Sequence, residues 1–323
     1  MEFTSKARAL RIGGSVIART PILLPSFSSQ VPIKKVGETL SPEQEAALKA
    51  YVTRLGETVA GPLLISAYDL HHGHIPQPNI DTGVFAAPLT FIDSGGYEVL
   101  CNDQLSFDRE QHSKVLAAWP QKAHAVAVNF DCPSDDLAHQ IDETLSMSGP
   151  DTLGKELLLK PGESGMDYLL AAIPKNAEKL GKLSVIGLTE KEAGSSLRDR
   201  LETIRNLRSQ LDSAGLSEMP IHVFGGLDPM RSYLYFLAGG DIFDGLSWLR
   251  FGFEKGKALY LDAYASVHYP LTAINEAEWQ IRRENFFKIL DMQVDMRKFL
   301  VSSNLADLHP DAVETWHRIY GAS

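Results

Sequence analysis

Eight short apolar segments recur along the chain, and most of them are closed by a glycine, proline, aspartate or serine. Segments of this length and composition are typical of buried β-strands, and helix-like segments separate most of them. Eight strands that alternate with helices are the number that a closed α/β barrel needs. The sequence therefore predicts a (β/α)8 TIM barrel, with strands at residues 21–27, 62–68, 88–93, 124–131, 155–160, 183–188, 220–225 and 241–247.

Segments outside the strands predict a cap and an extension. Residues 8–20 carry a Gly-Gly turn between two apolar alternations, which predicts a hairpin over the lower end of the barrel. Apolar residues recur at spacings of three and four over 192–213, so this segment should be an amphipathic helix between two parallel strands. A similar helical pattern runs over 274–300, through Ile281, Phe286, Ile289, Leu290, Met292, Met296 and Leu300.

The chain should form a single domain. Its 323 residues are 44% hydrophobic, enough for a substantial core, and we find no repeat or low-complexity linker. We therefore expect one barrel domain over residues 1–323, with 1–20 as the hairpin cap and 251–323 as a C-terminal helical extension.

Charge, cysteine content and hydropathy limit the function and the compartment. The net charge of -10 and pI near 5.5 exclude a globally basic nucleic-acid binder but leave a local cationic face open. Cys101 and Cys132 are too few for a disulfide scaffold or a four-thiolate zinc site, which favours a reducing, cytoplasmic compartment. The N-terminus lacks a signal-peptide pattern, and no apolar run approaches the ~20 residues that span a bilayer. We expect a soluble protein with no membrane partner.

Two aspartates stand where predicted strands end. Asp93 begins the sequence Asp-Ser-Gly-Gly-Tyr, and Asp244 lies in Asp-Ile-Phe-Asp-Gly-Leu at 241–246. Barrel enzymes build their active sites at the carboxyl ends of the strands. Two carboxylates in such a place can divide the roles of nucleophile and proton carrier. For either aspartate alone, a turn or a helix N-cap is the more common role.

These motifs, with Val223-Phe224-Gly225-Gly226 before the second, resemble the tRNA-guanine transglycosylase superfamily over roughly residues 8–300. Its members are (β/α)8 enzymes that exchange a guanine in a polynucleotide for a 7-deazaguanine base. The resemblance implies that Asp244 is the nucleophile, which attacks C1′ and expels guanine to leave a glycosyl-aspartate ester. It implies that Asp93 is the acid/base that assists guanine departure and deprotonates the incoming base. A carboxylate also stabilises the oxocarbenium-like transition state, as in retaining glycosidases.

The resemblance also assigns residues to the base. It places the ring of Tyr97 on one face of the heterocycle and Phe224 on the other, although core packing is the alternative role for both. It makes Asp131 the acceptor for the N1–H and N2–H edge of guanine, because two carboxylate oxygens suit two donors. The alternative for Asp131 is an N-cap of the helix that starts near Ser134.

Other matched positions lie on the next strands. Gly187 and Leu188 match a segment whose backbone amide and carbonyl meet the base, with Glu190 or Glu192 as the supporting acid. Lys160 stands where the family usually has a glutamine that donates to the guanine carbonyl, and a lysine can donate to the same oxygen.

The chain departs from the family in three ways. The cysteine cluster that binds a structural zinc is absent, and His268 and His317 cannot replace it, so we expect no metal and no other cofactor. Glu98 stands where many relatives have glutamine. Because the zinc subdomain helps relatives to dock RNA, its loss leaves open whether the polymer is tRNA or DNA, and one branch of the superfamily acts on DNA.

Cations after Asp244 are candidate polynucleotide contacts. They are Arg250, Lys255 and Lys257, followed along the last long helix by Arg282, Arg283, Lys288, Arg297 and Lys298. The alternative is a solvated helix face that is balanced by Glu276, Glu278, Glu284 and Asp295.

The sequence therefore predicts a pentosyltransferase that exchanges guanine in tRNA or DNA for a 7-deazaguanine of the preQ0, preQ1 or queuine type. Two other functions remain open. One is a non-catalytic binding subunit of a hetero-oligomeric transglycosylase, and the other is a nucleosidase or glycosidase on the same barrel. The resemblance is compatible with a homodimer or with a separate partner subunit.

Overall fold

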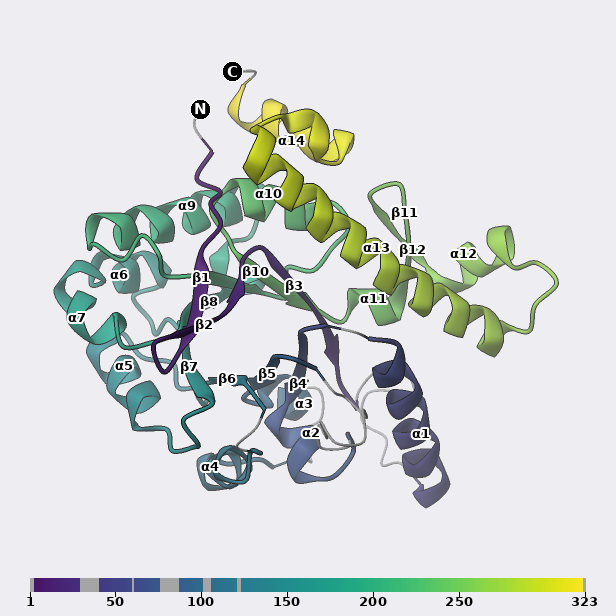
Figure 1. The fold of residues 1–323 in the computed structure, drawn as a ribbon, viewed down its shortest axis with the longest axis horizontal. Helices are drawn as coiled ribbons and strands as arrows, with labels where there is room; N and C mark the ends of the chain where they lie inside the picture. The colour runs from purple at the N-terminus through teal and green to yellow at the C-terminus, as the bar shows by residue number, and fades with distance from the viewer. Residues whose placement is uncertain are drawn as a thin grey trace.

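The predicted TIM barrel is confirmed by the computed structural model, which describes residues 3–29, 41–59, 61–75, 87–100, 106–120 and 123–321. Eight parallel strands close in the order β10-β3-β4-β5-β6-β7-β8-β9 (Figure 1). Each overlaps one of the predicted segments. Their bounds are β3 Ile22–Phe27, β4 Leu63–Ser66, β5 Thr90–Asp93, β6 Ala125–Val128, β7 Leu153–Leu158, β8 Val185–Thr189, β9 Ile221–Phe224 and β10 Ile242–Gly245.

The barrel strands are buried on both faces, because the inner face fills the barrel and the outer face packs on helices. Phe91 and Ile242 belong to the inner apolar cluster, whereas Ile92 and Phe243, their neighbours in the chain, belong to the cluster under the helices. Since side chains alternate along a strand, Asp93 and Asp244 lie on the same inner side as Phe91 and Ile242. The alternation thus directs both aspartates into the mouth of the barrel.

Helices surround the barrel and follow most of its strands. The clearest is α9, where Ser196 and Asp199 form a capping box and Leu201, Ile204 and Leu207 are buried. Helix α9 begins at Leu197 rather than at 192. Residues 190–193 form a separate short helix, α8 Glu190–Ala193. The helices of the barrel are α1 Pro42–Thr58, α2 Ala67–His71, α3 Gly96–Leu100, α4 Arg109–Ala117, α5 Leu137–Ser146, α6 Met166–Ala171, η1 Pro174–Asn176, α7 Ala177–Leu180, α8 Glu190–Ala193, α9 Leu197–Ser213, α10 Arg231–Leu237 and α11 Ser247–Arg250.

The predicted N-terminal hairpin is also confirmed. Strands β1 Ala9–Ile12 and β2 Ser15–Arg19 pair antiparallel, and the Gly-Gly turn between them has φ of 56° and 84°. Such left-handed angles suit glycine and the twist of a tight hairpin. Leu10 and Ile12 are buried in the inner apolar cluster, so the hairpin closes the barrel at the end opposite to the mouth.

The C-terminal extension contains more than the predicted helices. It begins with an antiparallel hairpin, β11 Phe251–Glu254 and β12 Lys257–Tyr260, which the helical pattern did not predict. The helices α12 Leu261–His268, α13 Ile274–Ser302 and α14 Pro310–Tyr320 follow, with the short turn η2 Leu305–Asp307 between the last two. Figure 1 shows α13 crossing the molecule toward α14, beside the N-terminus.

The long helix α13 attaches the extension to the barrel. Gln293 accepts a hydrogen bond from the backbone N–H of Leu23 in β3 at 3.0 Å, and Met292 and Met296 are buried. Leu290, expected on the buried face, is instead exposed, because it lies one position away from that stripe. Over the described ranges, no helix combines the length and the apolarity of a membrane span.

Candidate active site at the barrel mouth

Asp244 lies in β10 and is held by groups from two other parts of the mouth. Its Oδ2 accepts from Ser26 Oγ at 2.9 Å, and its Oδ1 accepts from the Gly225 backbone N–H at 2.9 Å. The same Oδ1 lies 3.3 Å from Nε2 of His222. Gly225 has a φ of 75°, a left-handed conformation that glycine adopts without strain. The carboxylate is therefore pre-positioned, and its charge is compensated where a nucleophile would be needed.

Asp93 ends β5 and faces the same mouth. Burial, together with the negative charges of Asp131 and Asp244, raises the pKa of Asp93 to about 7. A carboxyl group with such a pKa is present in both protonation states near neutral pH, so it can give a proton and take it back. The structure thus brings the two predicted acids into one electrostatically coupled group.

Asp131 and Lys160 follow the ends of β6 and β7 and form an ion pair of 3.1 Å. Lys160 Nζ also lies 3.4 Å from Oε1 of Glu192, and Thr189 Oγ1 donates to the other oxygen of Glu192 at 2.8 Å. Burial alone would lower the pKa of Lys160, but the charges of Asp131 and Glu192 outweigh it and raise that pKa. The mouth therefore presents a lysine cation between two carboxylates.

The helix-cap alternative for Asp131 is wrong. Helix α5 begins at Leu137, and Asp136 is its N-cap, with Oδ1 accepting from the N–H groups of Ala138 and His139. Asp131 instead accepts from Ser94 Oγ at 3.2 Å, which links it to the loop directly after Asp93.

The structure also distinguishes Glu190 from Glu192. Glu190 Oε1 accepts from Arg200 at 2.8 Å and from Arg231 and Tyr235, which tie it to helices α9 and α10. Glu192 is therefore the acid that faces the mouth, and Glu190 joins the helices around it.

Phe224 lies inside the barrel and stacks on His222, with ring centroids 3.8 Å apart. It is 8% exposed and belongs to the inner apolar cluster, so packing, the alternative role, is at least part of what it does. Gly187 makes room beside it: a Cβ there would lie 2.7 Å from Phe224 Cε2 and 2.8 Å from Glu156 Oε1. Gly187 and its neighbour Leu188 lie within β8, and the Gly187 carbonyl accepts from Leu159 N–H at 2.8 Å.

A second polar corner adjoins the mouth on helices α2 and α3. Glu98 is buried, and its Oε1 accepts from Ser28 Oγ at 2.6 Å. Burial and the nearby charge of Asp69 raise the pKa of Glu98 well above its usual value. Asp69 accepts from Ser29 N–H at 2.8 Å and lies 3.2 Å from His74 Nδ1. Tyr97 is the second residue of α3, next to this corner. Its side chain lies outside the described part, so its stacking role stays a prediction.

The predicted polynucleotide contacts divide into two groups. Arg282 is 3% exposed and donates to Leu249 O at 2.9 Å, Tyr51 OH and Glu278, so this side chain joins helices and is not available to a polynucleotide. Lys288 likewise donates inward, to Phe253 O and Tyr264 OH. The predicted side chains that remain exposed on the extension or next to it are Arg250, Lys255, Lys257, Arg283, Arg297 and Lys298.

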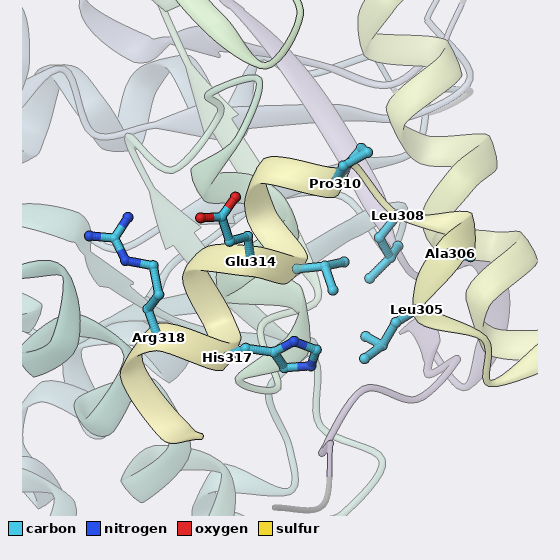
Figure 2. Close-up of a pocket in the computed structure, with 8 residues that line it drawn as sticks. Leu305, Ala306, Leu308, Pro310, Glu314, His317 and Arg318 are labelled. Atoms are coloured by element: carbon cyan, nitrogen blue, oxygen red, sulfur yellow. The ribbon is translucent and has the colours of Figure 1, made fainter. Parts of the chain in front are cut away.

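A hollow of about 690 Å³ lies away from the barrel mouth, between η2 and α14 (Figure 2). Its lining is mainly apolar, with Leu305, Leu308 and Val313 beside His317. None of the residues predicted for base binding or catalysis lines it. Across the part of the chain that the structure describes, no group of three or more His, Cys, Asp or Glu side chains is arranged to hold a metal ion.

Sequence reasoning missed three groups around Asp244: Ser26, Glu156 and His222. His222 lies two residues before Phe224, and Glu156 lies four residues before Lys160. An even spacing on a strand puts both on the inner face. The sequence signal for Glu156 and His222 was an ionisable residue at an inward-facing position of an apolar strand.

Comparisons with known proteins do not identify the chain. No family model matches it, and no curated protein matches it. The functional inference therefore depends on the residues at the barrel mouth.

Proposed function

We propose that the protein is a nucleic-acid guanine transglycosylase, which exchanges a guanine in a polynucleotide for a 7-deazaguanine base. One observation carries this proposal: Asp244, fixed by Ser26 and Gly225, shares the barrel mouth with Asp93, whose pKa is raised to about 7. Base exchange needs this combination, because one carboxylate must bond to the sugar while another moves a proton.

The chemistry takes two steps. An oxygen of Asp244 bonds to C1′ as the C1′–N9 bond breaks, and the N9 electron pair takes the proton of the Asp93 carboxylic acid. Guanine leaves, and a 7-deazaguanine enters. Asp93 then takes the proton of the incoming ring nitrogen while that nitrogen bonds to C1′, and the ester bond breaks to restore the Asp244 carboxylate. Both acids return to their starting states, so no cofactor is consumed.

The mouth also supports recognition of the base. The edge of guanine, and of a 7-deazaguanine, carries two adjacent donors and one acceptor. Asp131 offers two acceptor oxygens, and Lys160, 3.1 Å away, offers a charged donor for the carbonyl. Glu192 holds Lys160 from the other side, so the donor is oriented before the base arrives.

The direct test follows labelled base into polymer. The protein is incubated with labelled guanine or a 7-deazaguanine and with tRNA or duplex DNA, in parallel with Asp244→Asn. We expect label in one polymer with the wild type, and loss of incorporation by several orders of magnitude with Asp244→Asn, since the nucleophile is removed. Glu218→Gln, the same kind of change at an exposed ion pair with Lys6, is the control and should behave as wild type.

A denaturing gel after incubation adds a second readout, the covalent adduct between protein and polymer. The absence of both label and adduct, with wild type and Asp244→Asn alike, would contradict the proposal. An adduct that forms only after a second protein is added would indicate a subunit of a hetero-oligomer. Cleavage of free nucleosides without incorporation would indicate a nucleosidase.

A further inference from the structure

A buried carboxyl–imidazole pair lies next to Asp244. Glu156 on β7 and His222 on β9 are both 0% exposed, and Oε1 of Glu156 lies 2.8 Å from Nδ1 of His222. The opposite ring nitrogen, Nε2, lies 3.3 Å from Oδ1 of Asp244. Among the described residues, Nε2 has no hydrogen-bond partner. The imidazole is thus placed between a buried carboxylate and the proposed nucleophile.

The positions of the two ring nitrogens, each beside a carboxylate oxygen, favour a charged ring. Each faces a carboxylate oxygen, and a neutral imidazole would turn a lone pair toward one of them. An imidazolium presents an N–H to both. Burial alone would lower the pKa of His222, but the charges of Glu156 and Asp244 outweigh it and raise that pKa to about 9.

Two phenylalanine rings pack against the imidazole. Phe224 stacks on it from the same strand, and Phe91 on β5 meets it edge-on at 5.5 Å between centroids. On β8, Gly187 has no side chain, which leaves room for the Glu156 carboxylate. Within the described part of the chain, the ion-pair partners of His222 are Glu156 and Asp244, in a low-dielectric interior where their effect is large.

We propose that His222, held as an imidazolium by Glu156, is a positioning residue that stabilises the Asp244 carboxylate when the incoming base displaces it from the sugar. This role rests on the proposed function. In an exchange reaction the glycosyl ester must break as readily as it forms, so the carboxylate must be a good leaving group. A fixed cation next to Oδ1 favours the free carboxylate over the neutral ester.

The charge of His222 can be measured without any assay of activity. In ¹⁵N-histidine NMR spectra of the whole protein at pH 7.5, the His222 signals are those that disappear in His222→Gln. We expect both ring nitrogens to be protonated and to remain so to about pH 9. A neutral ring at pH 7.5, with the proton on Glu156, would overturn the inference.

The role of the pair is measured by the pH dependence of exchange. Glu156→Gln removes the larger charge that keeps His222 protonated, so the alkaline fall in kcat should move to lower pH. At pH values above the new midpoint, kcat should fall below that of wild type by about tenfold for each pH unit by which the midpoint has moved. In acid the imidazolium persists, and activity should approach that of wild type. A purely structural role would lower activity equally at all pH values. Glu218→Gln is the matched control.

His222→Gln gives an independent readout on the ester. Without the cation, exchange should slow by on the order of 10², and the fraction of enzyme trapped as covalent adduct should rise. A wild type with neither exchange nor adduct would overturn the proposed function and the role with it, while the NMR result still decides the charge of His222. An active wild type whose pH profile and adduct level are unchanged in both variants would overturn the inference alone.

Discussion

At the scale of single residues, environment rather than residue type separates the roles that we propose for the two aspartates. Asp244 accepts hydrogen bonds from Ser26 and Gly225 and lies 3.3 Å from Nε2 of His222. Burial and the negative charges of Asp131 and Asp244 raise the pKa of Asp93 to about 7. Two chemically identical side chains thus have different electrostatic environments, as the different roles that we propose for them require.

The raised pKa of Asp93 predicts a cost in stability that depends on pH. The pKa of Asp93 is about 7 in the folded protein and near 3.8 in the unfolded chain. Its ionised form therefore destabilises the fold, with the full cost above pH 7, and this cost disappears as the pH falls to about 4. Asp93→Asn should therefore raise the free energy of unfolding by about 1–3 kcal/mol at pH 8, a range reduced because the side chain is partly solvated. Urea titrations at pH 8 and pH 4 measure the difference.

The control for this prediction is Asp151→Asn, an exposed position that should change stability little at either pH. A gain for Asp93→Asn that is equal at both pH values would show that ionisation is not its cause.

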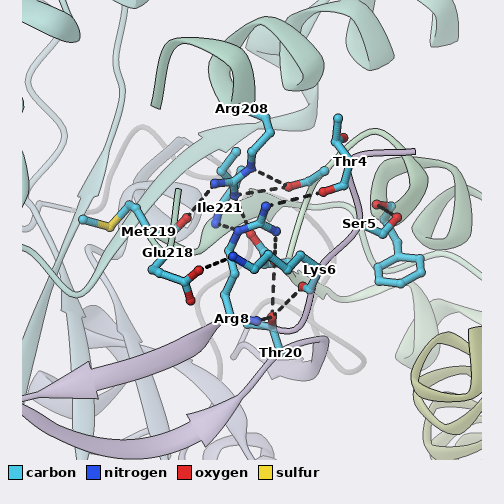
Figure 3. A network of polar contacts seen from close by, with 12 residues as sticks. Thr4, Ser5, Lys6, Arg8, Thr20, Arg208, Glu218, Met219 and Ile221 are labelled. Atoms are coloured by element: carbon cyan, nitrogen blue, oxygen red, sulfur yellow. Dashed lines mark hydrogen bonds and ion pairs between the residues drawn. The ribbon is translucent and has the colours of Figure 1, made fainter. Parts of the chain in front are cut away.

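At the scale of elements, a buried charge cluster joins the hairpin cap to the barrel at the end opposite to the mouth (Figure 3). Asp241, which directly precedes β10, accepts from Arg8 at 2.9 Å, from Arg208 of α9 at 2.7 Å and from the Ile221 N–H at 2.9 Å. All three side chains are at most 2% exposed. One carboxylate thus ties the N-terminal segment, a helix and two strands to each other.

Removing that carboxylate should leave two buried guanidinium groups without their shared partner. Asp241→Asn should destabilise the protein by about 3–5 kcal/mol, because an uncompensated buried charge costs more than the pair contributes. Urea denaturation followed by circular dichroism measures this. Breaking the exposed Lys6–Glu218 pair beside it, with Glu218→Gln, should change stability by about 0–1 kcal/mol. Equal effects of the two variants would show that burial does not set the energy of the cluster.

At the scale of the whole molecule, the net charge of -10 opposes a polyanion, so any polynucleotide must meet a local cationic surface. The hairpin β11–β12 carries Lys255 and Lys257, both exposed. In Figure 1 this hairpin lies on the opposite side of the molecule from α7. The fold therefore presents its candidate cations on an element that projects from the barrel.

If Lys255 and Lys257 contact phosphates, binding should weaken and become less dependent on salt when they are replaced. For the Lys255→Gln, Lys257→Gln double variant, the slope of log K against log salt concentration should fall by about two, roughly 0.9 per lost phosphate contact on a duplex. Filter binding or fluorescence anisotropy over a salt series measures the slope. Lys179→Gln on α7, which breaks an exposed pair with Asp142, should leave it unchanged. An unchanged slope in the double variant would exclude the hairpin as the docking surface.

Much of this architecture was predictable from the sequence, because it depends on local patterns. Short apolar runs between turn residues located the strands, and the Gly-Gly turn located the hairpin. The strands β11 and β12 were missed because residues 251–260 form a short hairpin without a marked alternation of apolar residues, and β12 is mostly exposed. The exposure of Leu290 and the burial of Arg282 were missed because both depend on what packs against α13.

The sequence by itself determined the barrel and placed Asp93 and Asp244 at strand ends, because the period of a strand and the residues that end it are local properties. Only the tertiary structure decided how the charges meet. It placed Lys160 between Asp131 and Glu192, assigned Glu190 to the surrounding helices, and set His222 between Glu156 and Asp244. These contacts join different strands, and closure of the barrel brings them together at distances that no local pattern encodes.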